Sequence, residues 1–331
     1  MYKLLFFFTL MAGTLVSISA SSWIIAWIGL EVNLLSFLPL MKKSDMYSSE
    51  AAIKYFIVQT MASMTLILSL IIFVNEKNFS SNLNLTTSLI LQLTLLMKMG
   101  AAPLHFWFPE VISGLNWMTS LILLTWQKIA PMMLLSYNMN SPLLTMIAII
   151  SSITGSILGF NQTCLRKILA YSSINHIGWM IMALLNSIYI WFSYFLIYAL
   201  MNLNITLMFK TSHTLFFPQL MNFYSNNNMK LFFMFNFISL GGLPPFLGFL
   251  PKWMTINSVT YTMGYLPITL IILATLITLY FYLRIIFLSL TLTSLMKTSI
   301  LNLPKMSFMS ALNNFLVLMS MMSLLSITLL M

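Results

Sequence analysis

Long apolar segments make up nearly all of this chain, and the connections between them are too short to hold a folded domain. A helix needs about 20 predominantly apolar residues to cross a lipid bilayer. Of the 331 residues, 60% are hydrophobic and only 6% are charged, whereas soluble domains carry about 25% charged residues. Because so few charges cannot cover a soluble surface, we expect an all-α polytopic membrane protein.

About eleven segments are long and apolar enough to be transmembrane helices. Their continuous runs differ from the short alternating strands of a membrane barrel. The predicted helices cover residues 4–20, 22–41, 51–74, 84–111, 118–138, 142–160, 165–185, 188–210, 230–258, 265–290 and 308–330. Glycine and proline interrupt two of them, 84–111 and 230–258. We expect the whole chain, 1–331, to form a single membrane domain.

The basic residues fall almost entirely on one side of this predicted topology, and Lys77 stands alone on the other side. The side of the N-terminus receives Lys3, Lys42, Lys43, Arg166, Lys167, Lys210, Lys230, Lys297 and Lys305. Such an asymmetry places the basic side in the matrix or cytoplasm. The net charge of +10 therefore indicates contact with lipid headgroups rather than with nucleic acid.

Four ionisable residues lie deep within predicted spans, and they are Glu31, Lys98, Lys128 and Lys252. A charge at the bilayer centre costs about 2.5–3.5 kcal/mol on insertion scales. One glutamate can neutralise only one of three lysines, and burial favours the neutral form of an ammonium group. Lysines in this setting can take up and release protons. The pattern predicts a proton-conducting path, and the alternative is a set of buried ion pairs that only hold helices together.

Two histidines, His105 and His176, also lie within predicted spans. Imidazole can donate and accept a proton, so both could relay protons between lysines, or they could be hydrogen-bonding core residues. Cys164 is the only cysteine, which excludes an all-cysteine iron–sulfur cluster held by this chain alone. The sequence has neither a dinucleotide-binding glycine motif nor a P-loop. We expect this chain to bind no cofactor and no metal.

The two interrupted spans are similar in sequence. They read "MKMGAAPLHFWFPE" at 97–110 and "SLGGLPPFLGFLPKW" at 239–253. Aligning Gly100 with Gly241 leaves Pro109 and Pro251 offset by one residue. The segments belong to the fourth and ninth predicted spans, so the second copy would be upside down in the membrane. This arrangement is typical of inverted-topology repeats, although Gly- and Pro-rich segments can also resemble each other by chance.

Six motifs occur in order between residues 27 and 254. They are "WIGLEVNLLSFLPL", "EAAIKYFIVQTMAS", "KMGAAPLHFWFPEV", "LLTWQKIAPM", "NQTCLRKILAYSSINHIGWM" and "GGLPPFLGFLPKWM". With these motifs the chain resembles the antiporter-like membrane subunits of mitochondrial NADH:ubiquinone oxidoreductase, respiratory complex I, in a form similar to that of arthropods. The resemblance implies two inverted five-helix repeats, 4–138 and 142–290, each with one broken helix, and a C-terminal transmembrane helix, 308–330.

The resemblance also implies a role for each buried charge. Glu31 and Lys98 would form an interacting pair. Lys128 would be the central relay, and Lys252 would belong to the second broken helix. The chain would then be a proton-translocating subunit of the membrane arm, driven by quinone reduction elsewhere in the complex. NADH, FMN, the iron–sulfur clusters and ubiquinone would be held by other subunits.

The implied partners are other membrane-arm subunits, accessory subunits and phospholipids including cardiolipin, with no nucleic acid. The implied location is the mitochondrial inner membrane, with the N-terminus on the matrix side. The residues leave three other functions open: a free-standing cation/proton antiporter, a haem- or quinone-binding redox subunit, and a passive scaffold. Three histidines would allow at most one bis-histidine haem.

Overall fold

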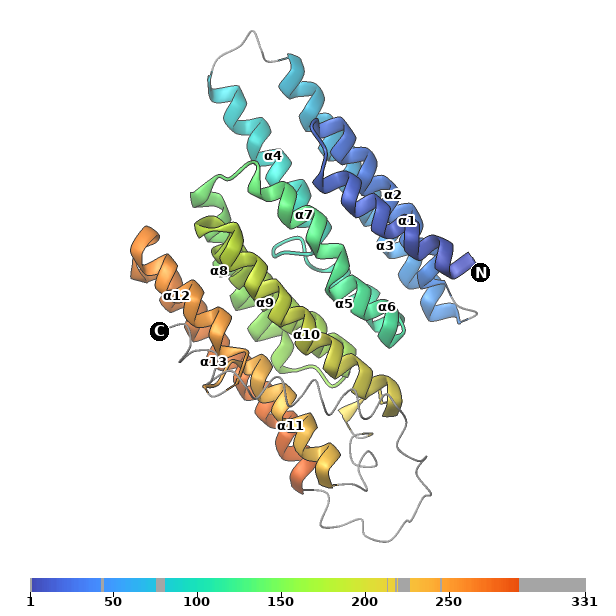
Figure 1. The fold of residues 1–331 in the computed structure, drawn as a ribbon, viewed down its shortest axis with the longest axis vertical. Helices are drawn as coiled ribbons and strands as arrows, with labels where there is room; N and C mark the ends of the chain where they lie inside the picture. The colour runs from blue at the N-terminus through green and yellow to red at the C-terminus, as the bar shows by residue number, and fades with distance from the viewer. Residues whose placement is uncertain are drawn as a thin grey trace. The chain divides into compact units, whose positions relative to one another are not determined.

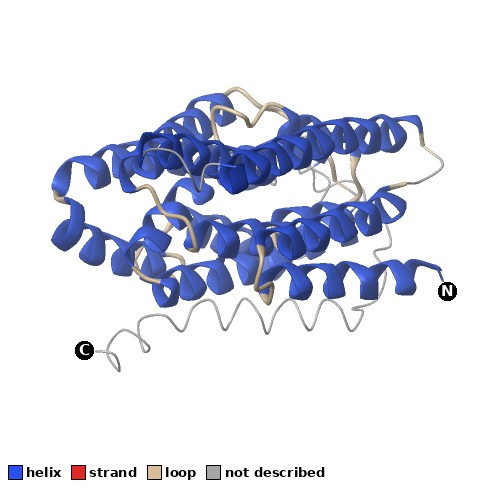
Figure 2. Cartoon of the chain, turned by 90° about the horizontal axis from the view of Figure 1, so that it is seen from above, coloured by secondary structure: helices blue, strands red, loops and turns tan. Residues whose placement is uncertain are grey.

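The structure, a computed structural model, describes residues 2–42, 45–75, 81–212, 214–217, 219, 227–244 and 246–291. Within these ranges every regular element is a helix (Figure 2). One isolated β-bridge pairs Cys164 with Phe216. The prediction of an all-α fold is therefore confirmed for the described part of the chain. The helix predicted at 308–330 lies outside the described residues.

The helices form two compact units, Met1–Ser151 and Ser152–Met331. The first unit, blue to green in Figure 1, contains α1 (Tyr2–Ile18), α2 (Trp23–Met41), α3 (Met46–Asn75), α4 (Ser81–Met99), α5 (Trp107–Gly114), α6 (Trp117–Leu124) and α7 (Trp126–Ser136). The boundary falls within α8 (Ser141–Phe160). The second unit contains α9 (Leu165–Asn186), α10 (Ile188–Ser212), α11 (Asn227–Gly241), α12 (Phe249–Met263) and α13 (Tyr265–Thr291).

Seven stretches of the described helices are long and apolar enough to cross a membrane. They are α2, Met46–Phe73 of α3, α6 together with α7, α8, α9, α10 and Tyr265–Phe287 of α13. Two shorter apolar helices are α1 and Thr86–Met99 of α4. The predicted span 230–258 is divided into α11 and α12, and each has 15 residues. Each is therefore shorter than the about 20 residues that one span requires.

The first unit is built on a close contact between the backbones of α1 and α2. A Cβ atom built on Gly29 would lie 2.6 Å from Ser17 N and 2.9 Å from Gly13 O. Small residues at such positions let transmembrane helices approach each other closely. The contact fixes α2, which carries Glu31 two residues after Gly29.

Three exposed charges join α3 to α5. Lys54 Nζ lies 2.9 Å from Glu50 Oε1, one turn earlier on α3, and 2.8 Å from Glu110 Oε2 on α5. Exposed ion pairs contribute little to stability. The Lys54–Glu110 pair instead fixes the position of α5. Glu110 lies in the first turn of α5, so the pair holds that turn against α3.

The second unit is built around α9. Seventeen of its 22 residues are buried, and it packs against α10, α12 and α13. A helix that is buried on all sides carries no amphipathic stripe. His176, near the middle of α9, is therefore inside the unit and not on its lipid-facing surface.

We predict that Gly29→Leu prevents normal assembly of the subunit, because the new side chain would have to displace the backbone of α1. Inserting side-chain volume into a tight contact costs about 1–3 kcal/mol, or more where backbone must move. The measurement is the amount of the variant in the assembled membrane complex on a native gel. Ile28→Leu is the control, because Ile28 is exposed. Normal assembly of Gly29→Leu would contradict the close contact.

Candidate functional site

Lys98 and Glu31 come together in the first unit. Lys98 lies in the last turn of α4, and its Nζ is 4.0 Å from Glu31 Oε1 on α2. Their side chains are only 4% and 21% exposed. The last carbonyls of a helix lack intrahelical partners and attract positive charge. Lys98 is therefore close to two negative groups, a carboxylate and a helix C-terminus.

The break after α4 begins at Gly100, which has a left-handed φ of 76°. Its N–H donates to Met97 O at 3.2 Å, and the N–H of Ala101 donates to Leu96 O at 3.0 Å. These two bonds form a Schellman motif, which is a common way to end a helix at a glycine. The sequence predicts a break at this glycine, and the structure confirms it.

Side chains from two other helices bind the carbonyls at the end of α4. Gln59 of α3 donates from Nε2 to Lys98 O at 3.1 Å. Trp107, the first residue of α5, donates from Nε1 to Met97 O at 3.2 Å. A buried carbonyl without a partner would be costly. The break is therefore supported by α3 and α5, and its position determines where Lys98 lies.

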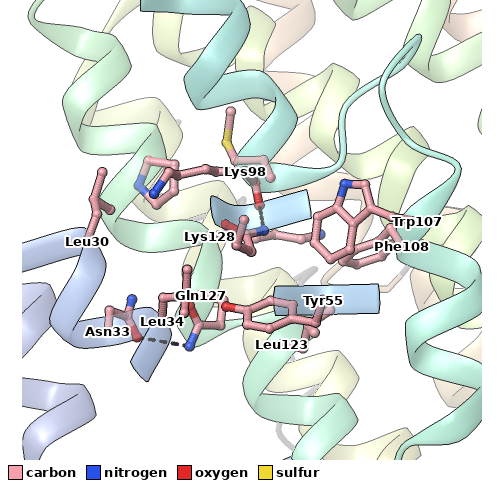
Figure 3. A pocket seen from close by; sticks show the side chains of 13 residues that line it. Leu30, Asn33, Leu34, Tyr55, Lys98, Trp107, Phe108, Leu123, Gln127 and Lys128 are labelled. Atoms are coloured by element: carbon pink, nitrogen blue, oxygen red, sulfur yellow. Dashed lines mark hydrogen bonds between the residues drawn. The ribbon is translucent and has the colours of Figure 1, made fainter. Parts of the chain in front are cut away.

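A small cavity of about 20 Å³ lies beside Lys98 (Figure 3), which is room for about one water molecule. Its polar lining comes from α2, α3, α4 and α7 and consists of Asn33, Tyr55, Gln59, Lys98, Gln127 and Lys128. Gln127 Nε2 donates to Asn33 Oδ1 at 2.9 Å. Cavities with several polar groups can hold ordered water, whereas apolar cavities stay dry. The structure thus places Lys98 and Lys128 on one polar cavity.

Lys128 is almost completely buried, with 1% exposure. It lies in the first turn of α7, which begins at Trp126. Its Nζ is 5.5 Å from the centre of the Phe108 ring on α5. The aromatic face favours a cation at that distance. Lys128 is thus positioned by a helix start and by a residue of the helix that follows the first break.

The predicted span 118–138 corresponds to α6 and α7 together, Trp117–Ser136, and the helix is interrupted within it at Thr125. This residue has φ −115° and ψ −73°, and its Oγ1 donates to Leu121 O at 2.7 Å. Threonine side chains can bind backbone in this way and bend a helix. Pro131 also lacks an N–H for the carbonyl of Gln127. Pro131 is the signal in the sequence that could have indicated an irregular helix.

Lys252 lies in the first turn of α12 in the second unit and is 6% exposed. Its Nζ donates to Gly241 O, the last carbonyl of α11, at 2.8 Å. It also lies 5.8 Å from the centre of the Trp179 ring on α9. A Cβ atom on Gly242 would be 2.8 Å from this Nζ. The missing side chain at Gly242 therefore leaves the space that Lys252 occupies.

The two helix breaks align with each other, but the glycine that matches Gly100 differs from the predicted one. The left-handed glycine after α11 is Gly242, with φ 75°, because α11 extends through Gly241. Gly242 therefore corresponds to Gly100, and the offset of one residue between Pro109 and Pro251 disappears. Both prolines lie in the first turn of the following helix, where a missing N–H is tolerated. They start helices, and the breaks lie before them.

The two histidines lie in different surroundings. His105 is in the first break, with its Nδ1 3.2 Å from Pro103 O and its ring stacked on Phe106. His176 Nδ1 lies 2.9 Å from the hydroxyl of Tyr194 on α10. His176 is one turn from Trp179 on α9, the residue that contacts Lys252. The structure therefore places His176 close to the surroundings of Lys252 within the second unit, whereas His105 belongs to the first unit.

Several polar residues of these sites are absent from the sequence-based expectations: Asn33, Tyr55, Gln59, Gln127 and Tyr194. Each is a single polar residue in an apolar helix, which gives a weak signal because no period or spacing marks it. Burial of an amide or phenol needs a hydrogen-bond partner, and only the fold shows which one. Within the described ranges, no cluster of three or more His, Cys, Asp or Glu residues could hold a metal.

The family described as "NADH:quinone oxidoreductase/Mrp antiporter, TM" matches residues 20–278. The NADH-ubiquinone oxidoreductase chain 2 of Anopheles gambiae is 49% identical over 286 residues, which cover 85% of this chain and 84% of that protein. The chain belongs to the NADH-ubiquinone oxidoreductase chain 2 family. The same protein of Locusta migratoria is 47% identical over 290 residues, covering 86% and 84% of the two chains. The resemblance drawn from the six motifs is confirmed.

Solved structures share the fold of this family member. A chain of respiratory complex I from Thermus thermophilus has a TM-score of 0.84 and 21% identity, covering 97% of this chain and 78% of that chain. A chain of the Mrp complex from a Dietzia species has a TM-score of 0.74 and 14% identity, covering 84% and 58%. At these identities the likeness establishes the fold alone, which is the antiporter-like fold of complex I.

We predict that Gly242→Ala displaces the Lys252 ammonium group from Gly241 O. The added methyl group would meet the lysine, and the left-handed φ is unfavourable for alanine. The measurement is the position of Lys252 in a structure of the complex that carries the variant. Gly241→Ala is the matched control, because its Cβ would lie 3.6 Å from the nearest atom. An unchanged Lys252 in Gly242→Ala would contradict the prediction.

Proposed function

We propose that this chain moves protons across the membrane within NADH:ubiquinone oxidoreductase. By its family, the chain is a membrane subunit of that enzyme. The observation that carries the proposal is the first-unit cavity, where Lys128 faces the same polar space as Lys98, and Lys98 is paired with Glu31. Amines that share a polar cavity can exchange a proton through water.

Helix ends give the two lysines different preferences for charge. Lys98 lies at the C-terminal end of α4 beside Glu31, and both favour its ammonium form. Lys128 lies at the N-terminal end of α7, where the helix disfavours positive charge. In the resting state the proton therefore resides on Lys98, and Lys128 is the group that can accept it.

The transfer depends on the state of the Glu31–Lys98 pair. Two unit charges 4 Å apart interact by about 4 kcal/mol at an effective dielectric constant of 20. A change in a neighbouring subunit that separates the pair would remove much of this attraction. Lys98 would then lose its proton and become a neutral amine, and Lys128 would gain that proton and become an ammonium. The energy would come from quinone reduction in other subunits.

Onward transfer toward Lys252 is a further part of the proposal, with His176 as a relay and His105 as a second one. In the second unit, support comes from the polar surroundings of α9, where Tyr194 lies against His176. Lys252 is held at a helix break that begins at a left-handed glycine, as the break after Lys98 does. Each unit thus has its own buried lysine at a break.

We also propose the finer topology that the sequence predicts. It comprises about eleven spans in two inverted repeats, 4–138 and 142–290, in the mitochondrial inner membrane with the N-terminus in the matrix. The common register of the two breaks supports the repeat, because Gly100 and Gly242 each precede a proline by nine residues. The proline lies in the same helical position both times. The asymmetry of basic residues supports the orientation.

The proposed partners follow from the same function. Other membrane-arm subunits and accessory subunits would flank the chain, and phospholipids including cardiolipin would bind its basic side. NADH, FMN, the iron–sulfur clusters and ubiquinone would be bound by other subunits of the complex. A chain that catalysed cation/proton exchange alone, without those subunits, would instead favour the free-standing antiporter.

We predict that Lys128→Ala blocks proton transfer through this subunit, tested at the corresponding residue of a genetically tractable relative. Loss of an acid–base group typically costs about 10²-fold or more in the transfer step. The measurement is the number of protons pumped per NADH oxidised in reconstituted, fully assembled complex. Lys42→Ala is the control, since Lys42 is exposed at the end of α2. An assembled Lys128→Ala complex that pumps normally would contradict the proposal.

A further inference from the structure

One hydrogen bond connects the helix of Glu31 with the helix of Lys128. Gln127 Nε2 on α7 donates to Asn33 Oδ1 on α2 at 2.9 Å (Figure 3). The main packing contacts of α2 are with α1 and α3, and those of α7 are with α1, α4 and α6. The amide pair therefore joins two helices that otherwise touch little, and it does so at the wall of the cavity.

The two residues lie in different backbone surroundings. Asn33 is packed against α1, since a Cβ atom on Gly13 would lie 2.9 Å from Asn33 N. Gln127 is the second residue of α7, just after the irregular Thr125. N–H groups in the first turn of a helix lack intrahelical acceptors. Gln127 thus lies where α7 begins, outside the close contact between α1 and α2 that holds Asn33.

Asn33 and Gln127 each lie close to a charged residue in the sequence. Glu31 precedes Asn33 by two residues on α2, and Lys128 directly follows Gln127 on α7. A displacement of α2 when the Glu31–Lys98 pair changes would act on Gln127, and through it on the turn that holds Lys128. The amides can donate and accept hydrogen bonds but do not titrate. They can orient water in the cavity without carrying the proton themselves.

We propose that Asn33 and Gln127 are positioning residues that transmit a change at the Glu31–Lys98 pair to Lys128. This inference rests on the proposed proton transfer. It assigns the coupling between the two lysines to a neutral side-chain pair, in addition to the charges.

The test exchanges the lengths of the two side chains in the assembled complex. Gln127→Asn shortens the reach by one methylene group and breaks the bond to Asn33. We expect the protons pumped per NADH to fall, with proton transfer slowed about two- to tenfold, as for loss of one neutral hydrogen bond. The double variant Asn33→Gln with Gln127→Asn restores the combined length and should recover most of the pumping. A merely space-filling role would not give this rescue.

The matched control is Gln92→Asn. Gln92 is another buried glutamine of the first unit, and its side chain donates a hydrogen bond to Asn138 O at 2.7 Å. It does not line the cavity. The control variant should leave the number of protons per NADH unchanged. If Gln127→Asn does not assemble, Gln127→Met keeps the length without the hydrogen bond and should lower pumping in the same way. Normal pumping in an assembled Gln127 variant, or a double variant no better than the single one, would overturn the inference. Lys128→Ala, measured alongside, separates this outcome from failure of the proposed function.

Discussion

The break after Met99 is the constraint on which the rest of the first unit depends. It ends α4 within the unit, so that Lys98 lies at a helix C-terminus facing Glu31. It also starts α5 at Trp107, whose indole binds the end of α4 and whose neighbour Phe108 lies against Lys128. An unbroken helix would leave no carbonyls for Gln59 and Trp107 to bind. The cavity beside Lys98 would then lose two of its walls.

Helix ends inside an apolar protein can stabilise or destabilise charge without adding further ionised groups. The structure has such ends at α4, α7 and α12, and each carries a lysine in its terminal turn. The partial charges of these helix ends differ in sign. The C-terminal end of α4 presents carbonyls and is negative, whereas the N-terminal ends of α7 and α12 present N–H groups and are positive. Lys252 compensates by reaching back to the last carbonyl of α11. Only small changes in nearby charge are needed to move a proton between such lysines, because electrostatic interactions are strong in a poorly solvated interior.

The sequence predicts the features that glycine, proline and charge mark directly. The helical class and the breaks at Gly100 and near Gly241 follow from residue types that are rare in apolar helices. The pair formed by Glu31 and Lys98 was implied by the family resemblance, because the charges alone do not say which lysine Glu31 meets. The interruption at Thr125 was missed because threonine is common in membrane helices and bends only some of them. The Asn33–Gln127 bond could not be predicted, since it depends on how α2 and α7 meet across many intervening residues.

The central claim is that a proton passes from Lys98 to Lys128 through water in their shared cavity. The most direct measurement is a structure of the intact complex under turnover, at a resolution that shows water. The account predicts ordered water between the two lysines, and at least one state in which Lys98 has moved away from Glu31. A cavity without water in every state, with the Glu31–Lys98 pair unchanged, would contradict it.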